Sequence, residues 1–153
     1  MTPSTTDERV YSLERSTAAR WLDEADTTLA RRAHPNDLEF VSDLHANEFP
    51  ATYATAHHLV HDPDLFTFVV ERAGAPIGYA SGHLNDDGSG QIDFMAVAPD
   101  ARGVGDGSVL LAATLAALFD EADLDEVRLS VEEHRRPAIK FYEKHGFTRV
   151  RPS

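Results

Sequence analysis

The sequence contains no cysteine, which excludes disulfide bonds, thiolate metal ligands and cysteine nucleophiles. Lysine is nearly as scarce, with two lysines beside 12 arginines, 15 aspartates and 11 glutamates. The net charge of −12 argues against a nucleic-acid or membrane-surface partner, because both need a basic face. No apolar run approaches the ~18 residues of a membrane span, and residues 1–26 lack a charged and then apolar leader. We therefore expect a cytoplasmic protein.

The composition also bears on the salt concentration in which the protein works. An acidic, lysine-poor surface suits a salt-rich cytoplasm, where the screening length at ~1 M salt is about 3 Å and self-repulsion is weak. The alternative interpretation is an ordinary acidic protein from a GC-rich genome. A length of 153 residues with 42% hydrophobic content is enough for one domain with a buried core.

Turn residues and hydrophobic spacing predict an α+β fold with a mixed sheet. Three strands joined by tight turns form an antiparallel meander, and the period then changes to helical from Ser108 onward. Residues 1–26 are interpreted as an N-terminal extension and residues 27–153 as the single domain. The expected strands are 10–13, 28–33, 65–71, 77–84, 91–98, 127–131 and 147–150, and the expected helices are 16–25, 36–49, 53–61, 108–122 and 136–145.

The most informative segment is the glycine-rich turn 102–108 (RGVGDGS), which leads from a strand into a helix. Glycines at alternate positions permit a tight turn that exposes N–H groups at a helix N-terminus, where a phosphate-type anion is favoured. A P-loop would need a lysine before the final serine, and none is present. Asp125 lies where a dinucleotide fingerprint has its acidic residue, but too little chain follows for the second half of that fold.

Residues 99–111 (PDARGVGDGSVLL) resemble the acyl-CoA signature Arg/Gln-x-x-Gly-x-Gly/Ala of the GNAT superfamily of N-acyltransferases. Residues 138–147 (AIKFYEKHGF) resemble the second signature of that family, Ala-x-x-x-Tyr followed by Gly-Phe. The resemblance covers roughly residues 28–150. It implies a mostly antiparallel sheet flanked by helices, in which the fourth and fifth strands, 91–97 and 127–131, splay apart.

The resemblance also implies roles for single residues, with acetyl-CoA as cosubstrate and no metal. Tyr142 matches the tyrosine that protonates the departing CoA sulfur. The pantetheine arm would pair with the backbone of residues 95–97, and the pyrophosphate would lie on amides of the glycine-rich turn. The expected cosubstrate-binding residues are Met95, Ala96, Val97, Arg102, Gly103, Val104, Gly105, Asp106, Gly107, Ser108 and Arg135.

Three features depart from the family pattern. Arg135 stands where an asparagine is frequent; it is unable to replace an amide but could reach a CoA phosphate. Asp106 stands at a usually apolar position, and its carboxylate would cost affinity unless it pointed to water or were screened by salt. The chain stops at Ser153, before the strand that usually inserts beside the fifth one. Residues 10–13, from the same chain or from a dimer mate, could fill that gap; the competing interpretation makes 9–15 the first strand and 17–32 the first helix.

A base is important when the acceptor is a lysine-like amine, and Asp93 on the fourth strand is the main candidate. Glu132, Glu133 and His134 are alternatives, whereas Gln91 and Ser130 replace the glutamates of some relatives. Residues 47–53 resemble the loop that walls the acceptor site, with Glu48 and Tyr53 as candidate contacts. His57 and His61 have the spacing of metal ligands, but an exposed polar helix face explains them better.

We therefore expect an N-acetyltransferase that moves acetyl from acetyl-CoA to a primary amine by direct attack in a ternary complex. The acceptor, a small molecule or a protein amine, is not specified by the sequence. The alternative is a non-catalytic acyl-CoA-sensing module with the same fold. A dinucleotide-binding protein is a third interpretation, and it would require stabilisation by NAD rather than CoA.

The charge composition generates a first prediction. Both the unfolding temperature and the affinity for CoA should rise as salt increases from ~0.1 M, where the screening length is about 10 Å. The reason is that salt weakens the repulsion of the acidic surface for itself and for a polyanionic ligand. Thermal unfolding and calorimetric titration over a salt series would measure both. Maximum stability and affinity at the lowest salt would contradict the halophilic interpretation.

Overall fold

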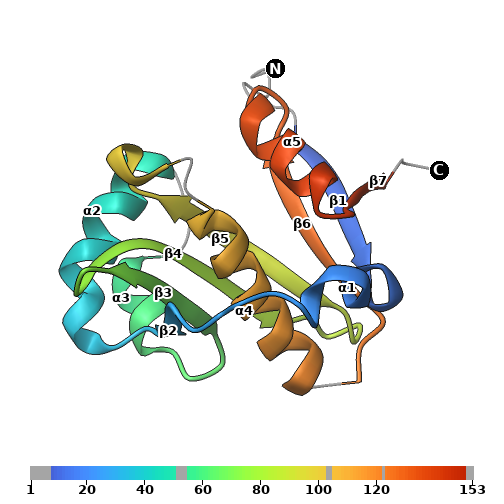
Figure 1. Ribbon diagram of the computed structural model, residues 1–153, viewed down its shortest axis with the longest axis horizontal. Coiled ribbons are helices and arrows are strands. Elements are labelled where there is room, and N and C mark those ends of the chain that lie inside the picture. The colour runs from blue at the N-terminus through green and yellow to red at the C-terminus, as the bar shows by residue number, and fades with distance from the viewer. Residues whose placement is uncertain (1–7, 51–54, 103–104, 122, 151–153) are drawn as a thin grey trace, which may run out of the picture.

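A computed structural model describes residues 8–50, 55–102, 105–121 and 123–150 (Figure 1). The described strands form one seven-stranded sheet in the order β2-β3-β4-β5-β6-β1-β7. The strands are β1 (Glu8–Glu14), β2 (Ala30–Arg32), β3 (Phe66–Arg72), β4 (Ala75–Leu84), β5 (Gly90–Val97), β6 (Glu126–Glu132) and β7 (Thr148–Val150). The helices are α1 (Arg15–Leu22), α2 (Leu38–Glu48), α3 (Ala56–His61), α4 (Asp106–Glu121) and α5 (Arg136–Lys144), with 3₁₀ turns at Pro35–Asp37 and Pro99–Ala101.

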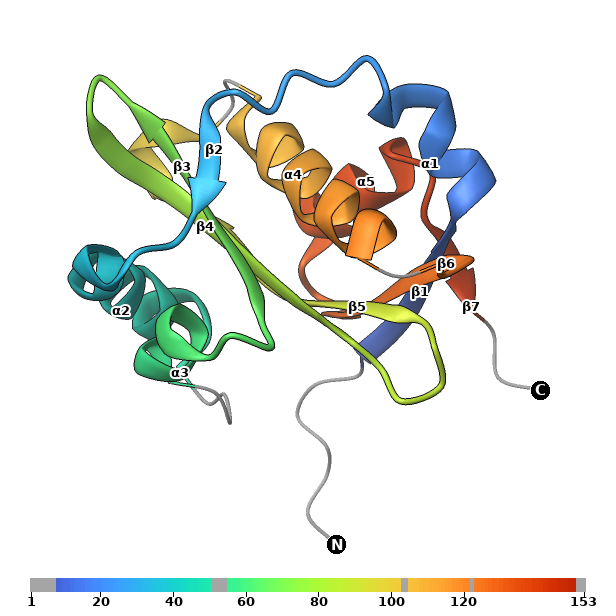
Figure 2. The ribbon, with the colours of Figure 1, turned by 90° about the horizontal axis from the view of Figure 1, so that it is seen from below.

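Neighbouring strands are antiparallel throughout, except that β5 and β6 are parallel. Helices α1, α4 and α5 cover one face of the sheet, and α2 and α3 cover the other (Figure 2). This is the predicted α+β architecture with a mixed, mostly antiparallel sheet. The predicted meander is confirmed as β3-β4-β5, and the helical spacing of Leu111, Leu115 and Leu118 is confirmed in α4, where all three side chains are buried.

Strands β5 and β6 separate after a short stretch of pairing. The parallel register joins only residues 90–92 to residues 127–129. On the other side of β5 the register with β4 shifts, since Ser81 pairs with Phe94 and Gly82 with Ile92, so that Asp93 is an extra residue in β5. A β-bulge bends and twists its strand, which turns the rest of β5 away from β6. The predicted splay of these two strands is confirmed.

Gly82 is required at this bulge. A Cβ atom at this position would lie 2.6 Å from the backbone oxygen of Gln91, which is closer than real Cβ atoms approach. The bulge therefore depends on close approach of the β4 backbone to β5, and only glycine allows it.

Strand β1 fills the place beside β6. It pairs antiparallel with β6 over its full length and with β7 on its other side. The hypothesis that residues 10–13 complete the sheet is thus confirmed in its same-chain form. Segment 1–26, interpreted as an extension, supplies both β1 and α1 to the fold. The proposed helix over 17–32 is wrong, because α1 ends at Leu22 and β2 begins at Ala30.

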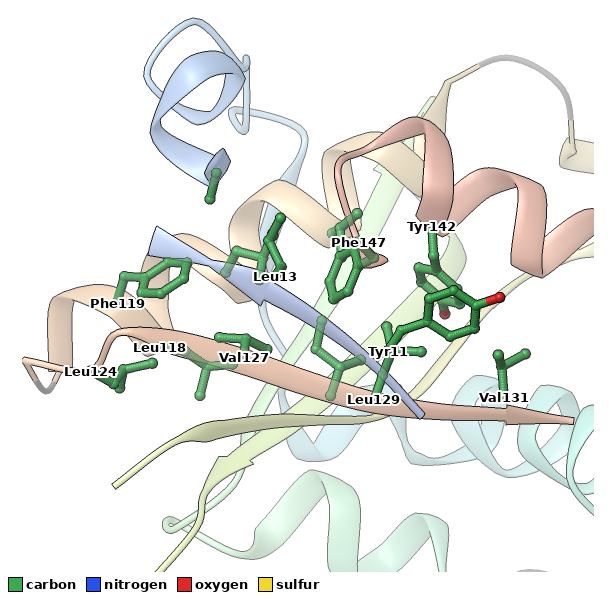
Figure 3. Close-up of a cluster of buried hydrophobic side chains, with 14 of the residues drawn as sticks. Tyr11, Leu13, Leu118, Phe119, Leu124, Val127, Leu129, Val131, Tyr142 and Phe147 are labelled. Carbon is green, nitrogen blue, oxygen red and sulfur yellow. The ribbon is translucent and has the colours of Figure 1, made fainter. Parts of the chain in front are cut away.

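The side chains of β1 explain why the strand belongs there. Tyr11 and Leu13 alternate inward and are fully buried, in a core shared with α4, α5 and β6 (Figure 3). Val10 points the other way and is 39% exposed. This alternation is the pattern of a strand with one buried face.

Replacing Leu13 by alanine is expected to lower the free energy of unfolding by ~2–5 kcal/mol, the usual cost of a cavity in a packed core. Val10→Ala, on the opposite face of the same strand, is the matched control and should cost about 0.5 kcal/mol. Urea unfolding followed by circular dichroism measures both. Equal, small losses would contradict the placement of β1 within the sheet.

Candidate active site

The glycine-rich turn leads into the N-terminus of α4. Gly105 has a φ of +89°, a left-handed conformation that glycine adopts without strain. The N–H of Val109 donates to the carbonyl of Gly105 at 3.3 Å. In the first turn of a helix the preceding N–H groups have no acceptor within the helix, so they attract an anion. Gly103 and Val104 lie outside the described residues.

A cavity of about 550 Å³, here called the loop cavity, opens between this turn, β5 and α5. All the expected cosubstrate-binding residues that the structure describes line it. They are Met95, Ala96, Val97, Arg102, Gly105, Asp106, Gly107, Ser108 and Arg135. Phe141 and Lys144 of α5, which the sequence analysis did not single out, line it as well.

A second cavity of about 140 Å³, here called the strand cavity, lies where β5 and β6 have separated. Asp93, Phe94, Ser130 and Glu132 contribute to its walls. The two cavities share four lining residues: Met95, Arg135, Ala138 and Tyr142. A molecule in one cavity and a molecule in the other would therefore meet beside the side chain of Tyr142.

Tyr142 lies on α5 and is 8% exposed. Burial raises the pKa of its phenol to about 12, although the positive charge of Arg135 acts in the opposite direction. The phenol is therefore protonated at neutral pH and has a proton to donate. Tyr142 lines both cavities, beside the separated strands, and its role as a proton donor stays a prediction.

Asp93, the main candidate base, lines the strand cavity, and its side chain is 9% exposed. Its Oδ2 lies 2.6 Å from Nδ1 of His83 on β4. This contact holds the Asp93 carboxylate against the imidazole of His83, which is partly open to solvent. The sequence analysis missed His83.

The alternative bases have other partners. Glu132 lines the strand cavity, but its Oε1 accepts a hydrogen bond from Nε of Arg135 at 2.9 Å. Glu133 pairs with Arg9 at 2.9 Å, and that hydrogen bond lowers the pKa of the Glu133 carboxyl. Glu133 and His134 line neither cavity. Asp93 and Glu132 are thus the candidates that line the strand cavity. Glu132 is held by a permanently charged guanidinium, whereas Asp93 contacts an imidazole, and the role of Asp93 as base stays a prediction.

Arg135 is directed toward α2. Besides Glu132, its guanidinium donates to the backbone oxygen of Glu48 at 2.7 Å and lies 5.1 Å from the ring centre of Phe49. It thus links the turn after β6 to the end of α2, beside both cavities. Its contact with a CoA phosphate stays a prediction.

Glu48 lines the loop cavity, and its carboxylate pairs with Nη2 of Arg102 at 2.9 Å. The Nε of Arg102 donates to the carbonyl of Val97 at 3.0 Å. Arg102 is thus hydrogen-bonded to one of the backbone oxygens that we expect to face pantetheine. Tyr53, the other candidate acceptor contact, lies outside the described residues.

Asp106 differs most from expectation. Its side chain is completely buried and neither points to water nor depends on salt for screening. It receives two hydrogen bonds from Nε of Arg72, both of 2.9 Å, and an ion pair with Nη2 at 2.8 Å. The sequence analysis considered water and salt as the two ways to offset this charge; the structure shows a third, because Arg72 at the end of β3 neutralises the carboxylate. Arg72 is 34 residues away in sequence, and no motif marks it.

His57 and His61 stack with their ring centres 4.1 Å apart, and Nδ1 of His61 bonds to the carbonyl of His57. Across the residues described here, no group of three or more histidines and carboxylates is placed to hold a metal ion. The described helices also include none that is long and apolar enough to cross a membrane.

Comparison with known proteins agrees with this geometry. The chain is 40% identical to the mycothiol acetyltransferase of Thermomonospora curvata over 82 residues, which are 54% of this chain and 27% of that protein. It is 30% identical to an uncharacterized N-acetyltransferase of Methanocaldococcus jannaschii, over 78% of this chain and 77% of that protein. The structure of Arabidopsis thaliana NAA60 in complex with a bisubstrate analogue superposes with a TM-score of 0.70 at 21% identity, over 80% of this chain and 85% of that one.

The matched mycothiol acetyltransferases are much longer proteins, and the chain spans less than a third of their length. The family model for the Acetyltransferase (GNAT) family matches residues 13–147, which include both sequence signatures, the loop cavity and Tyr142. The chain therefore belongs to the GNAT family of acetyltransferases.

Proposed function

We propose that this protein transfers an acetyl group from acetyl-CoA to a primary amine by direct attack, with both substrates bound together. One observation carries the proposal: the loop cavity and the strand cavity meet at Tyr142. A ternary complex needs two compartments that share a reaction point, and a covalent enzyme intermediate does not. The names of the relatives, which are acetyltransferases, support acetyl transfer in general.

In this proposal acetyl-CoA occupies the loop cavity. Its pyrophosphate lies on the amides at the start of α4, and its pantetheine arm pairs with the backbone of residues 95–97. That edge of β5 is available because pairing with β6 ends at Ile92. An extended chain adds to such an edge as a peptide strand does. Arg102 then loses its hydrogen bond to the carbonyl of Val97, which frees its Nε to donate to the cosubstrate while Nη2 keeps its ion pair with Glu48.

The amine occupies the strand cavity. Its nitrogen lone pair attacks the thioester carbonyl carbon, the carbon–sulfur bond breaks, and the sulfur leaves as a thiolate. Asp93 takes one proton from the ammonium before the attack, and Tyr142 gives its proton to the thiolate. The second proton, which the nitrogen loses as the amide forms, returns the Tyr142 phenolate to its neutral form. A lysine amine of pKa ~10.4 carries a penalty of roughly 4–5 kcal/mol for reaching its neutral form at pH 7, against about 1 kcal/mol for an α-amine of pKa ~7.8.

Tyr142→Phe removes the hydroxyl and keeps the ring. We expect kcat to fall by ~10²-fold or more, a typical general-acid contribution, with little change in the Kd for acetyl-CoA. Release of free CoA thiol measures kcat, and calorimetry measures Kd. Wild-type kcat in this variant would remove the tyrosine from the mechanism.

Asp93→Asn removes the base at constant size. We expect kcat/KM at pH 7 to fall much more for lysine-like acceptors than for α-amines, because only the former depend strongly on deprotonation. The loss of kcat/KM for lysine-like acceptors should become smaller as the pH rises toward the pKa of the amine. Glu133→Gln is the matched control, since Glu133 lines neither cavity. Equal losses for both acceptor classes would refute a role for Asp93 as base.

A non-catalytic acyl-CoA-sensing module is the alternative, favoured by the hydrogen bond that ties Arg135, which lines both cavities, to the backbone of Glu48. Such a module would bind CoA tightly and release no thiol with any amine. A thermal-shift screen with acetyl-CoA, followed by thiol release with a panel of amines and peptides at low and high salt, distinguishes the two. We further propose that the protein works in a salt-rich cytoplasm, on the strength of its charge composition.

A further inference from the structure

A negative side chain stands at the point where a polyanion is proposed to bind. Asp106 is the first residue of α4 and lines the loop cavity, although its carboxylate is fully buried. An unpaired carboxylate there would itself interact with the positive end of the helix dipole, and would so weaken the attraction of that end for a second anion. It would also repel a pyrophosphate a few ångströms away, through a region of low dielectric.

Arg72 provides the compensation. It ends β3, its side chain is 47% exposed, and Nε and Nη2 both contact the Asp106 carboxylate within 2.9 Å. It does not line the loop cavity, so it acts on the cosubstrate by its charge and its pairing with Asp106 rather than by contact. Strand β3 also packs against α4, which holds the two partners in place.

We propose that Arg72 is a positioning residue for acetyl-CoA, which cancels the charge of Asp106 and so keeps the N-terminus of α4 attractive to the pyrophosphate. This inference rests on the proposed function. It assigns a role to a residue outside both signatures, and it explains how the anion site tolerates an aspartate at a usually apolar position.

The proposal has an asymmetric consequence. Loss of Arg72 leaves an uncompensated charge beside the pyrophosphate, whereas loss of the Asp106 charge removes a repulsion and leaves a cation behind the site. If the pair only braced β3 against α4, removing either partner would do similar harm. The direction of the Asp106 effect therefore separates the two roles.

The experiment compares Arg72→Gln, Asp106→Asn and the double variant by calorimetric titration at low salt. The probes are acetyl-CoA and S-acetylpantetheine, which lacks the phosphates. Arg128→Gln is the matched control for the loss of one positive charge, because Arg128 pairs with Glu126 away from both cavities. Thermal unfolding of each variant shows whether it is folded.

We expect Arg72→Gln to raise the Kd for acetyl-CoA by ~10-fold or more, consistent with a charge interaction near a protein surface. Asp106→Asn should tighten acetyl-CoA binding by about 2- to 5-fold. In the double variant, the rise in Kd caused by Arg72→Gln should largely disappear. The Kd for S-acetylpantetheine should not respond to Arg72→Gln, and Arg128→Gln should leave both affinities unchanged.

Weaker acetyl-CoA binding by Asp106→Asn, unchanged binding by Arg72→Gln, or an equal loss for S-acetylpantetheine would each overturn the proposal. If Arg72→Gln fails to fold, the sign of the Asp106→Asn effect decides alone. Absence of acetyl-CoA binding by the wild-type protein would be a different failure, that of the proposed function itself.

Discussion

The parting of β5 and β6 after three paired residues is the constraint on which the site depends. The bulge at Asp93 turns β5 away, and one structural event then has three results. It leaves the backbone of residues 95–97 unpaired by β6, it opens the strand cavity, and it places the bulge residue itself in that cavity. Helix α5 then brings Tyr142 to the point where the two cavities meet. One extra residue in β5 thus accounts for the free strand edge, for the strand cavity and for the position of the candidate base.

A sheet that separates in the middle loses hydrogen bonds, so both halves need their own support. On the far side of the gap, β1 lies between β6 and β7 and buries Tyr11 and Leu13 against α4 and α5. On the near side, α2 and α3 pack on Tyr79 and Phe94. Tyr79 carries a buried hydroxyl hydrogen-bonded to His45, and burial raises the pKa of that phenol. Packing on both sides, rather than pairing across the gap, holds the opening.

Sequence reasoning located the elements because their signals are local. The spacing of Leu111, Leu115 and Leu118, the turn at 85–88 and the glycine-rich junction each lie within one element or loop. The two signatures likewise placed Tyr142 and the loop-cavity residues together. Contacts such as Arg72 with Asp106 and His83 with Asp93 depend on which strands are neighbours and in what register. A one-residue shift would remove them, and no spacing along the chain encodes them.

The charges around the loop cavity explain how so acidic a protein can attract a polyanion. Three arginines at or behind that cavity each have a carboxylate partner: Arg102 with Glu48, Arg135 with Glu132, and Arg72 with Asp106. Their charges therefore largely cancel, and in the proposed complex the amides at the start of α4 would supply a major part of the attraction. Such hydrogen bonds act at contact distance, where dissolved salt screens little, whereas free arginines would attract over a range that salt shortens. An anion site built on amides and balanced pairs would suit the salt-rich environment that we propose for this protein.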